Sequence, residues 1–411
     1  MIHRESICFL DSPQCWYIRR MKRHISRCVI PLAFGVSLAI FQPSAIAQGM
    51  KRPADPIRVI FDEDVDGVIG VNADPLIMLL QAKNIEVMGV TVVTGDGWLK
   101  QETADALKIL EMEEHSNIPV FMGAELPLVQ ARDTLLHLTE LYGGSRTDPF
   151  LGAYSEFGPG PDDVQAPPGG FAKTGAQPGS AAEFIIRTIR AHPRQITLYC
   201  GGPLTNVALA ISLAPDIVPL TKEVVFMGTS PEFQPKTVNV LYDPHAARIV
   251  LHAPWPKITI FSVDICEKVH RTPEMAEAIA SGRNAPVAAL YRDTVVKPYR
   301  EGKQGQWFRM PDELMAAYLI DPSIVTEVRR YYVDVDLNEG MGYGASSYWD
   351  ETPKGYNDAP WPDKPQAGRQ KPVPPPNARV VNAAWNFDID RFKKLYLDLM
   401  TGPPQEMQPA R

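Results

Sequence analysis

The sequence contains little cysteine, and this shortage excludes two classes of protein. Only five of its 411 residues are cysteine. Cys200 and Cys266, the two in the body of the chain, are too few for a disulfide scaffold and lack the close spacing of a zinc site. The sequence leaves open whether they form one disulfide or stay as two buried thiols, and it favours the thiols.

The sequence also has no surplus of positive charge. Lysine and arginine number 41 against 48 aspartate and glutamate, so the net charge is −7 at pH 7. Proteins that bind DNA or RNA usually carry a basic face, and we therefore expect a small-molecule ligand instead. With 45% hydrophobic and 22% charged residues, the composition is that of a soluble globular protein, long enough for one large domain.

No apolar stretch near the N-terminus spans a bilayer comfortably. The stretch at 28–41 is too short, and Pro31 interrupts it. It follows a basic start and precedes a small-residue tripeptide that ends at Ala47, which is the pattern of a secretory signal peptide. We predict an upstream extension at 1–20, a signal peptide at 21–47, a domain at 48–411, a periplasmic or secreted location, and no stable membrane span.

From about residue 57 short β-branched runs alternate with amphipathic stretches, such as the helix predicted at 101–114. This alternation predicts an α/β fold in which helices flank a largely parallel, Rossmann-like sheet in a single large domain. In such sheets ligands bind beyond the carboxyl ends of the strands. The predicted strands are 57–61, 85–93, 118–123, 196–200, 223–228 and 257–265.

Two long stretches interrupt this alternation. Residues 141–180 are too long for a simple connection and contain several aromatic side chains, so we expect an active-site flap, with a surface insertion as the alternative. Residues 346–380 are rich in proline and are expected to cross the surface before a last helix at 388–400.

Three aspartates, Asp62, Asp64 and Asp66, stand at alternate positions after the first predicted strand. An EF-hand calcium loop needs a bidentate acid at its twelfth position and a helix in front of the loop. Here the twelfth position is Ala73 and a predicted strand precedes the loop, so the EF-hand interpretation fails. A haloacid-dehalogenase-type phosphatase would use the first two acids, but convincing counterparts of its downstream lysine and paired acids are missing. Carboxylates crowded on one loop repel each other, which is a reason to expect a bound cation.

Five segments in register resemble the inosine-uridine-preferring nucleoside hydrolase family. They begin with the aspartate-rich loop in "IFDEDVDGVIGVNADPLIMLL", and the most specific is the Gly-Pro-Leu-Thr-Asn motif in "TLYCGGPLTNVALAI". The resemblance extends from residue 57 to about residue 400. The five segments lie at 60–80, 90–98, 197–211, 238–251 and 311–322.

The resemblance implies Ca²⁺-dependent hydrolysis of the N-glycosidic bond of ribonucleosides or related N-ribosides, giving free base and ribose. Asp64 corresponds to the family's carboxylate that binds Ca²⁺ and takes the proton from water. Asp74 and Asp312 correspond to further calcium carboxylates, and the residue whose carbonyl binds the ion corresponds to Gly201. Turn formation and helix capping are the structural alternatives for these acids.

Other polar residues are expected around these ligands. Asn239 corresponds to an asparagine that contacts the ribose, although it could instead hold a loop in place. The further candidates are Asp96, Asn72 and Asp66 for contacts with the substrate, and Asp62 and Asn206 for support of the metal site.

The sequence departs from the family at three positions that concern the substrate. Ala73 replaces an acid that touches a ribose hydroxyl, and Thr237 replaces a glutamate. Pro311 replaces a histidine that protonates the leaving group in several members, so this route is absent. The aromatic candidates for stacking on a base are Trp98, Tyr154, Phe157 and Trp307.

The expected function is therefore that of a secreted N-glycosyl hydrolase that uses Ca²⁺ and acts on a small molecule, as a monomer or a homo-oligomer. A binding protein of the same fold without catalysis is the first alternative, because Ala73 and Pro311 alter the site. The haloacid-dehalogenase-type phosphatase is the second. Release of base from a nucleoside distinguishes both from the hydrolase.

Overall fold

The computed structural model describes residues 55–142, 146, 149–156, 158–232, 236–303, 309–351 and 374–404. The predicted extension and signal peptide at 1–47 lie outside the described residues, as do Phe157 and Trp307. Pro53–Arg411 forms one compact unit, and the description below concerns this unit.

A nine-stranded sheet forms the centre of the unit, with the order β3-β2-β1-β4-β5-β6-β9-β7-β8. All neighbouring strands from β3 to β9 are parallel, whereas β7 runs antiparallel to β9 and to β8. The predicted largely parallel sheet is confirmed. The strands are β1 (Ile57–Glu63), β2 (Ile85–Val92), β3 (Val120–Met122), β4 (Ile196–Cys200), β5 (Glu223–Met227), β6 (Ile258–Phe261), β7 (Val325–Val335), β8 (Ser346–Asp350) and β9 (Arg379–Phe387).

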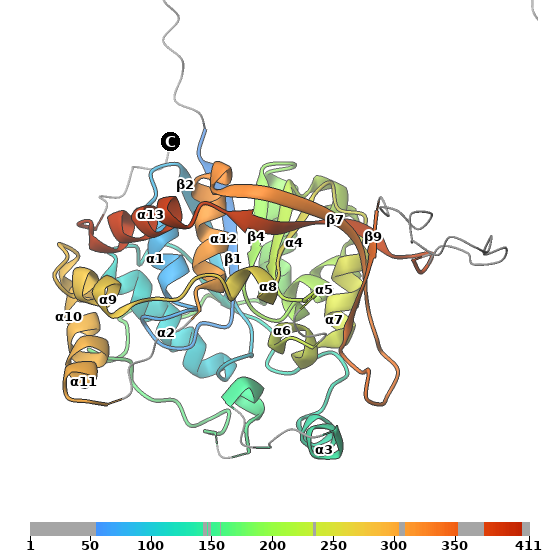
Figure 1. Cartoon of the computed structure of the whole chain (residues 1–411), viewed down its shortest axis with the longest axis horizontal. Coiled ribbons are helices and arrows are strands. Elements are labelled where there is room, and N and C mark those ends of the chain that lie inside the picture. The colour runs from blue at the N-terminus through green and yellow to red at the C-terminus, as the bar shows by residue number, and fades with distance from the viewer. Residues whose placement is uncertain are drawn as a thin grey trace, which may run out of the picture. The chain divides into compact units, whose positions relative to one another are not determined.

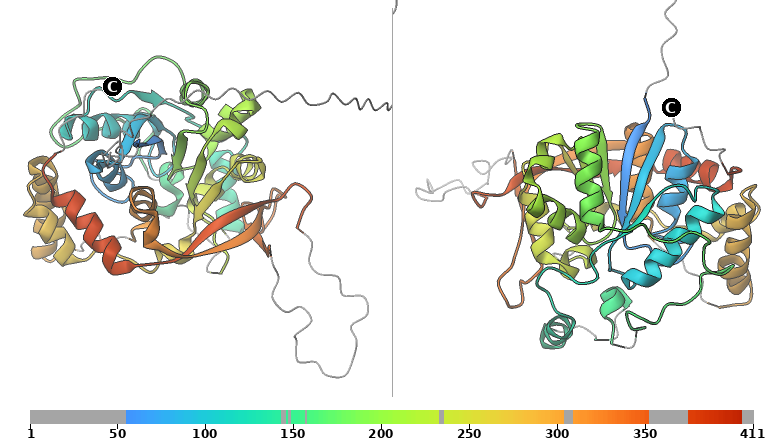
Figure 2. Two further views of the ribbon diagram at one scale, coloured as in Figure 1. Left: turned by 90° about the horizontal axis from the view of Figure 1, so that it is seen from above. Right: turned by 180° about the vertical axis from the view of Figure 1, so that it is seen from behind.

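Helices cover both faces of the sheet (Figures 1 and 2), and each face has its own apolar core. Successive side chains of a strand point to opposite faces, so Val59 and Phe61 of β1 join one core and Ile60 joins the other. Strands buried on both faces read as continuous apolar runs, which is why β1 to β6 were visible in the sequence.

The helices divide between the two cores. The first core includes side chains from α1 (Asp74–Gln81), α2 (Leu99–Met112), α8 (Val263–Cys266), α9 (Pro273–Ala280), α10 (Ala285–Leu290), the π-helix η3 (Tyr291–Val296), α12 (Pro311–Ile320) and α13 (Ile389–Thr401). The second includes side chains from α4 (Ala181–Ala191), α5 (Thr205–Leu213), η2 (Pro215–Leu220), α6 (Val238–Tyr242) and α7 (Pro244–His252). Two further short helices follow directly in the chain: α11 (Lys297–Arg300) comes after η3, and η4 (Pro322–Ile324) comes after α12.

The C-terminal strands differ from the sequence prediction. The stretch 346–380 was expected to be irregular, but β8 occupies its start and β9 begins at its end, and residues 352–373 lie outside the described part. β8 has only five residues, and both β8 and β9 are only partly buried, so they give a weaker sequence signal than the strands that are buried on both faces. The last helix, predicted at 388–400, is confirmed as α13.

The segment predicted as a flap contacts the loop after β2. It contains η1 (Pro149–Tyr154) and follows α3 (Arg132–Tyr142), which lies below the sheet in Figure 1. The backbone N–H of Ala153 donates to the carbonyl of Gly95 at 2.9 Å. A Cβ on Gly152, whose φ is +51°, would collide with that carbonyl. Part of this stretch therefore covers the carboxyl edge of the sheet.

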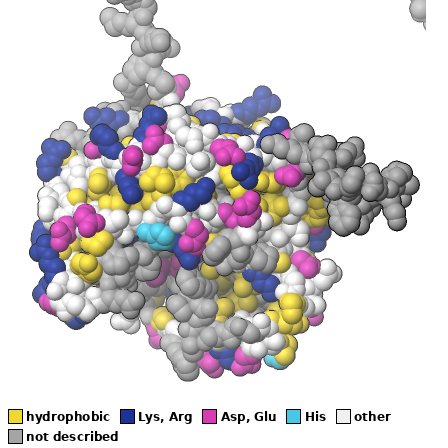
Figure 3. Space-filling view, viewed as in Figure 1, with side chains coloured by type: hydrophobic (Ala, Val, Ile, Leu, Met, Phe, Trp, Pro, Cys, Tyr) yellow, Lys and Arg dark blue, Asp and Glu magenta, His cyan; other side chains and the backbone are white. Residues whose placement is uncertain are grey.

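The described surface agrees with the composition. On the face shown in Figure 3, basic and acidic side chains are interspersed. No helix of the described residues has the length and apolar character needed to cross a membrane.

Cys200 and Cys266 are both buried and free, so the two do not form a disulfide.

Candidate active site

Buried acids gather where the strand order of the sheet reverses. Successive strands are added on one side of β1 from β2 to β3, and on its other side from β4 onward. Ligands of open α/β sheets bind at such a switch point, beyond the carboxyl ends of the strands. Glu63 ends β1, Asp64 follows it, and Gly201 follows β4. The sheet topology thus brings these three residues to one place.

Asp62 supports this edge from within the sheet. Its Oδ1 accepts hydrogen bonds from Thr91 Oγ1 at 2.5 Å and from Asn206 Nδ2 at 2.8 Å. Burial raises the pKa of Asp62 to about 7. Asn206 also accepts from the backbone N–H of Ala124, so it links β1 to the loop after β3. The predicted supporting pair, Asp62 and Asn206, is in contact, and Asn206 does not cap α5.

Asp64 is held by hydrogen bonds and enclosed by backbone. Its Oδ2 accepts from the backbone N–H of Asp96 at 2.9 Å, and its Oδ1 accepts from Asn72 Nδ2 at 3.3 Å. A Cβ on Gly95 would overlap the carboxylate, and one on Gly202 would lie 2.7 Å from Oδ1. Both positions therefore require glycine for lack of space. Asp64 is 1% exposed, and burial raises its pKa.

Two more acids surround Asp64. Asp96, a predicted substrate contact, also accepts from Asn72 Nδ2 at 3.4 Å. Burial, followed by the charges of Asp64 and Asp66, raises the pKa of Asp96 to about 8. Glu102 on α2 was missed by sequence reasoning; it accepts from Gly97 N at 2.6 Å, and burial raises its pKa well above the usual value. Asp66 is exposed, and its charge helps to raise the pKa values of Asp96 and Glu102.

Glu63 was also missed, although it lies between two predicted acids. Its side chain is fully buried, and neither carboxylate oxygen receives a hydrogen bond from an N–H or hydroxyl donor among the described residues, whereas the carboxyl group of Asp64 lies against it. Burial, and then the charges of Asp312 and Asp64, raise the pKa of Glu63 well above its usual range. The carboxylate lies against the α-carbon of Gly201, where any Cβ would overlap it. A buried polar group without partners is costly, so this placement needs an explanation.

Asn239 and Gly201 form a direct contact. The side-chain amide of Asn239, on α6, donates to the carbonyl of Gly201 and to the carbonyl of Met227 at 3.1 Å. Asn239 is 8% exposed. Asn239 and the predicted carbonyl ligand are therefore neighbours, and Asn239 also joins the ends of β4 and β5.

Asp312 reaches the acids from the first turn of α12. The hydroxyl of Tyr199 donates to its backbone carbonyl at 2.9 Å and holds the start of the helix against β4. The carboxylate oxygen Oδ1 has no hydrogen-bond partner among the described residues. Burial raises the pKa of Asp312 well above its usual value, and the charges of Glu313, Asp64 and Asp96 raise it further.

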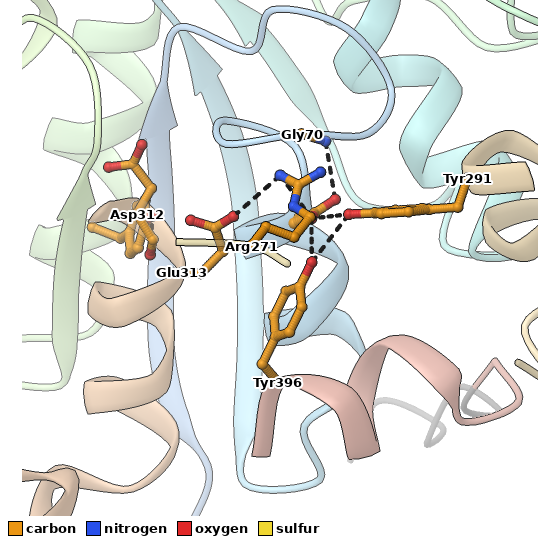
Figure 4. A network of polar contacts seen from close by, with 8 residues as sticks. Gly70, Arg271, Tyr291, Asp312, Glu313 and Tyr396 are labelled. Atoms are coloured by element: carbon orange, nitrogen blue, oxygen red, sulfur yellow. Dashed lines mark hydrogen bonds and ion pairs between the residues drawn. The ribbon is translucent and has the colours of Figure 1, made fainter. Parts of the chain in front are cut away.

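Asp74 belongs to a different network. Its Oδ1 accepts from Gly70 N at 3.0 Å, and its Oδ2 accepts from the hydroxyls of Tyr396 at 2.7 Å and of Tyr291. The Nη2 of Arg271 lies 3.6 Å from Oδ2. Figure 4 shows the two tyrosines and Arg271 converging from separate elements. The carboxylate of Asp74, predicted as a metal ligand, is therefore already neutralised by the protein itself.

The two neighbouring acids of α12 point in different directions. Glu313 points toward Arg271, 3.7 Å from its Nη2, whereas the carboxylate of Asp312 points away from Arg271 (Figure 4). Both side chains are buried, at 0% and 3% exposure. Asp312 therefore faces the acids of β1, and its neighbour faces the Arg271 network.

The aromatic candidates Trp98 and Tyr154 pack in a small core under the flap. Their ring centroids are 5.9 Å apart, and Tyr154 lies 4.7 Å from Tyr242. The indole N–H of Trp98 donates to the carbonyl of Pro159 at 2.7 Å. Tyr154 is 1% exposed. Both predicted stacking residues thus pack against other aromatic side chains, and Trp98 holds the stretch at 141–180 through its hydrogen bond to Pro159.

The buried acids fit a cation only in part. The unpartnered oxygens of Glu63 and Asp312, beside Asp64, are groups that a bound cation would satisfy. Asp74 is already neutralised, however, and within the described ranges no group of three or more Asp, Glu, His or Cys side chains is arranged to hold a metal ion. The structure does not bring Asp64, Asp74 and Asp312 together as one ligand set.

Comparison with known proteins identifies the family to which this chain is similar in sequence and fold. The family model described as "Inosine-uridine preferring nucleoside hydrolase" matches residues 59–394. A protein of that name from Leishmania major is 28% identical over 360 residues, covering 85% of this chain and 100% of the relative. The pyrimidine-specific ribonucleoside hydrolase RihB of Escherichia coli O9:H4 is 26% identical over 280 residues, covering 66% and 82%.

Solved structures agree with the fold. A purine-preferring ribonucleoside hydrolase from Gardnerella vaginalis matches with a TM-score of 0.59 at 20% identity, over 84% of this chain and 98% of that chain. An inosine-guanosine nucleoside hydrolase matches with a TM-score of 0.60 at 23% identity, over the same two shares. The expected nucleoside-hydrolase-type fold is confirmed.

Replacing Arg271 by methionine should destabilise the protein strongly. The change leaves Asp74 and Glu313 buried without their cation, and breaking a buried ion pair costs about 3–5 kcal/mol. Chemical denaturation measures this loss. The same substitution at Arg300, which pairs with Glu277 on the surface, should cost no more than about 1 kcal/mol. Equal small losses for the two variants would show that the Arg271 network does not stabilise the fold.

The stability contribution of Asp105 should depend on pH. This α2 residue accepts from Gly67 N and from Gln101, and burial raises its pKa from 3.8 to about 6. The folded state therefore holds its proton longer, so wild-type stability falls as pH rises through this window. Relative to wild type, Asp105→Asn should gain up to about 3 kcal/mol between pH 4 and pH 7.

Urea unfolding at several pH values measures this change. Asp216→Asn is the control with the opposite sign, because Arg190 lowers the pKa of Asp216. A difference between wild type and Asp105→Asn that stays constant with pH would refute the prediction.

Proposed function

This chain belongs to the inosine-uridine preferring nucleoside hydrolase family, and we propose that it hydrolyses ribonucleosides or related N-ribosides in a Ca²⁺-dependent reaction. Membership makes it an N-glycosyl hydrolase and does not favour the phosphatase alternative. The observation that carries the proposal is the setting of Asp64, which is buried, held by two hydrogen bonds and enclosed by glycine backbone at the switch point of the sheet.

Asp64 would act as the general base. Hydrolysis of an N-riboside passes through an oxocarbenium-like sugar, and water must lose a proton as it attacks. Burial raises the pKa of Asp64, which makes its carboxylate a stronger base at neutral pH. The N–H of Asp96 and the amide of Asn72 fix its two oxygens, so the carboxylate keeps one orientation toward the water.

Calcium is the cation that we propose for this site. When bound, it would lower the pKa of a coordinated water and hold the hydroxyls of the sugar. Asp64, Asp312 and the carbonyl of Gly201 are oxygen donors of the kind that Ca²⁺ prefers. The unpartnered Oδ1 of Asp312 supports this proposal.

We assign the sugar contacts to polar groups around Asp64. Asn239, Asn72, Asp96 and Asp66 are the candidates, because they surround the carboxylate or the carbonyl of Gly201. Pro311 has no proton to give, so the base must leave without help from this position. The names of the relatives describe different base preferences: inosine-uridine preferring, pyrimidine-specific and purine-preferring. The substrates tested below therefore include both purine and pyrimidine nucleosides.

Replacing Asp64 by asparagine should abolish base release. A general base contributes about 10²–10⁴-fold to rate, so a loss of at least this size is expected with inosine, uridine, guanosine and cytidine. Liberated ribose and free base are measured with Ca²⁺ and with a chelator, which should stop the wild type. The exposed acid variant Asp216→Asn is the control and should keep full activity.

Three outcomes would contradict the proposal in whole or in part. Undiminished hydrolysis by Asp64→Asn would show that Asp64 is not the general base. Binding of nucleosides by the wild type without any release of base would indicate the silent binding protein that the sequence leaves open. Activity that survives the chelator would overturn only the Ca²⁺ dependence.

We also propose that the protein is exported and cut after Ala47, which lies outside the described residues. The basic start, the apolar stretch and the small residues before Gln48 support this proposal. After expression in a bacterium that exports proteins to a periplasm, the N-terminal sequence of the purified protein should begin at Gln48. A chain that retains its first 47 residues would refute it.

A further inference from the structure

Glu63 is the buried acid whose placement the proposed reaction does not explain. It is 0% exposed, and neither of its carboxylate oxygens receives a hydrogen bond from an N–H or hydroxyl donor among the described residues. Its carboxyl group instead lies against the carboxyl group of Asp64, so the two can share a hydrogen bond only when one of them carries a proton. By contrast, the equally buried Glu113 accepts from Gln81 at 2.9 Å and from Asn284 at 2.8 Å. A charged carboxylate is not stable in a buried place without donors or a cation.

Space for the Glu63 carboxylate exists because residue 201 is glycine. A Cβ at Gly201 would overlap both oxygens of Glu63. The φ of Gly201 is not in the left-handed region, so the backbone itself does not demand glycine here. The absence of a side chain at 201 therefore serves the carboxylate of Glu63, and the same residue carries the carbonyl that was predicted to bind the ion.

The neighbours of Glu63 are acids as well. The charges of Asp312 and Asp64 act directly on it, and Asp312 Oδ1 is likewise without a partner among the described residues. Carboxylates and a backbone carbonyl at one place are the oxygen donors that hard divalent cations take. The oxygens of Glu63 and Asp312 that lack a donor, next to Asp64, thus point to a cation as the group that would satisfy them.

Asp74 cannot bind this cation without losing its hydrogen bonds and its ion pair with Arg271. Gly70 N, two tyrosine hydroxyls and the guanidinium of Arg271 already surround its carboxylate. Turning it toward an ion would leave Arg271 with Glu313 alone. An ion pair that loses one partner in the interior costs several kcal/mol, so Asp74 is the less suitable ligand.

We propose that Glu63 is a ligand of the divalent cation, together with Asp64 and Asp312, and that it takes the place expected for Asp74. The inference rests on the proposed function, because it concerns the cation of the same site. The three carboxylates do not converge on one point in the described structure. The side-chain torsions of Glu63 would let its carboxylate adjust toward an ion within the space beside Gly201.

Calcium binding, measured by isothermal titration calorimetry on the full chain, tests the inference without reference to activity. Glu63→Gln should weaken Ca²⁺ binding by about tenfold or more, because the number of charged ligands sets the affinity of such sites. Asp74→Asn should weaken it clearly less. Glu113→Gln, the same substitution at an equally buried glutamate away from the site, should stay within about twofold of wild type.

Thermal melting provides the second measurement and a check of folding. In a chelator, Glu63→Gln should melt at a higher temperature than wild type, because it removes one of several buried like charges. With Ca²⁺ added, its gain in melting temperature should be smaller than the gain of wild type. A glutamate with a merely structural role would lower the melting temperature in both conditions when replaced.

Gly201→Ala provides an independent route, because it keeps every charge. The new methyl group displaces the carboxylate of Glu63 and should weaken Ca²⁺ binding as Glu63→Gln does. In a Glu63→Ala background the space is free, so adding Gly201→Ala should then change neither binding nor melting further.

The outcomes separate this inference from the proposed function. If Glu63→Gln binds Ca²⁺ within about threefold of wild type, the inference is wrong while nucleoside hydrolysis by wild type still stands. It is also wrong if Asp74→Asn loses as much affinity as Glu63→Gln. If the wild type binds none of Ca²⁺, Mg²⁺, Mn²⁺ and Zn²⁺, the inference is overturned, and release of base from nucleosides then decides the proposed function by itself.

Discussion

Buried negative charge at the reversal point of the sheet is the constraint on which the rest of this structure depends. The chain places Glu63, Asp64 and Asp312 in one region and Asp74 with Glu313 in another, and all five side chains are almost fully buried. Burial of an isolated carboxylate is strongly unfavourable, so each group needs a proton, donors or a cation. The two regions meet this requirement in different ways.

The second region compensates its charge with the protein's own groups. Arg271 lies between Asp74 and Glu313, and the hydroxyls of Tyr291 and Tyr396 donate to Asp74. The first region has the N–H and amide donors on Asp64 but none on Glu63. Burial therefore raises the pKa values of Glu63, Asp64 and Asp312, and a proton or a bound cation would compensate these acids. The protein thus compensates the acids of the second region with its own groups, whereas it provides no such compensation for Glu63 in the first region.

The sequence allowed the parallel half of the fold and the centre of the site to be predicted, for physical reasons. Strands buried on both faces appear as apolar runs, and side chains at their carboxyl ends meet at one edge, so the acids after β1 could be placed at the site from local pattern. The roles of Asp64 and Gly201 came from the resemblance to the nucleoside hydrolase family. The role of Asp74 could not be read in this way, because Arg271 and Tyr396 lie about 200 and 320 residues further along the chain. Local patterns do not reveal such distant contacts. Glu63 was overlooked for the same reason, because the space for its carboxylate depends on Gly201, which is distant in the sequence.

The departures from the family motif affect the sugar and base contacts more than the activation of water. Asp64 keeps its bonded and enclosed carboxylate. By contrast, Ala73 and Pro311 have no polar side-chain group, and the hydroxyl of Thr237 accepts from Thr229 N, which commits it to the loop after β5. Recognition of a substrate relies on groups that contact its hydroxyls and its base, and a site that loses such a group changes its preference more than its chemistry. The bond that is broken should therefore be that of the family, whereas the sugar and the base should be contacted by other residues.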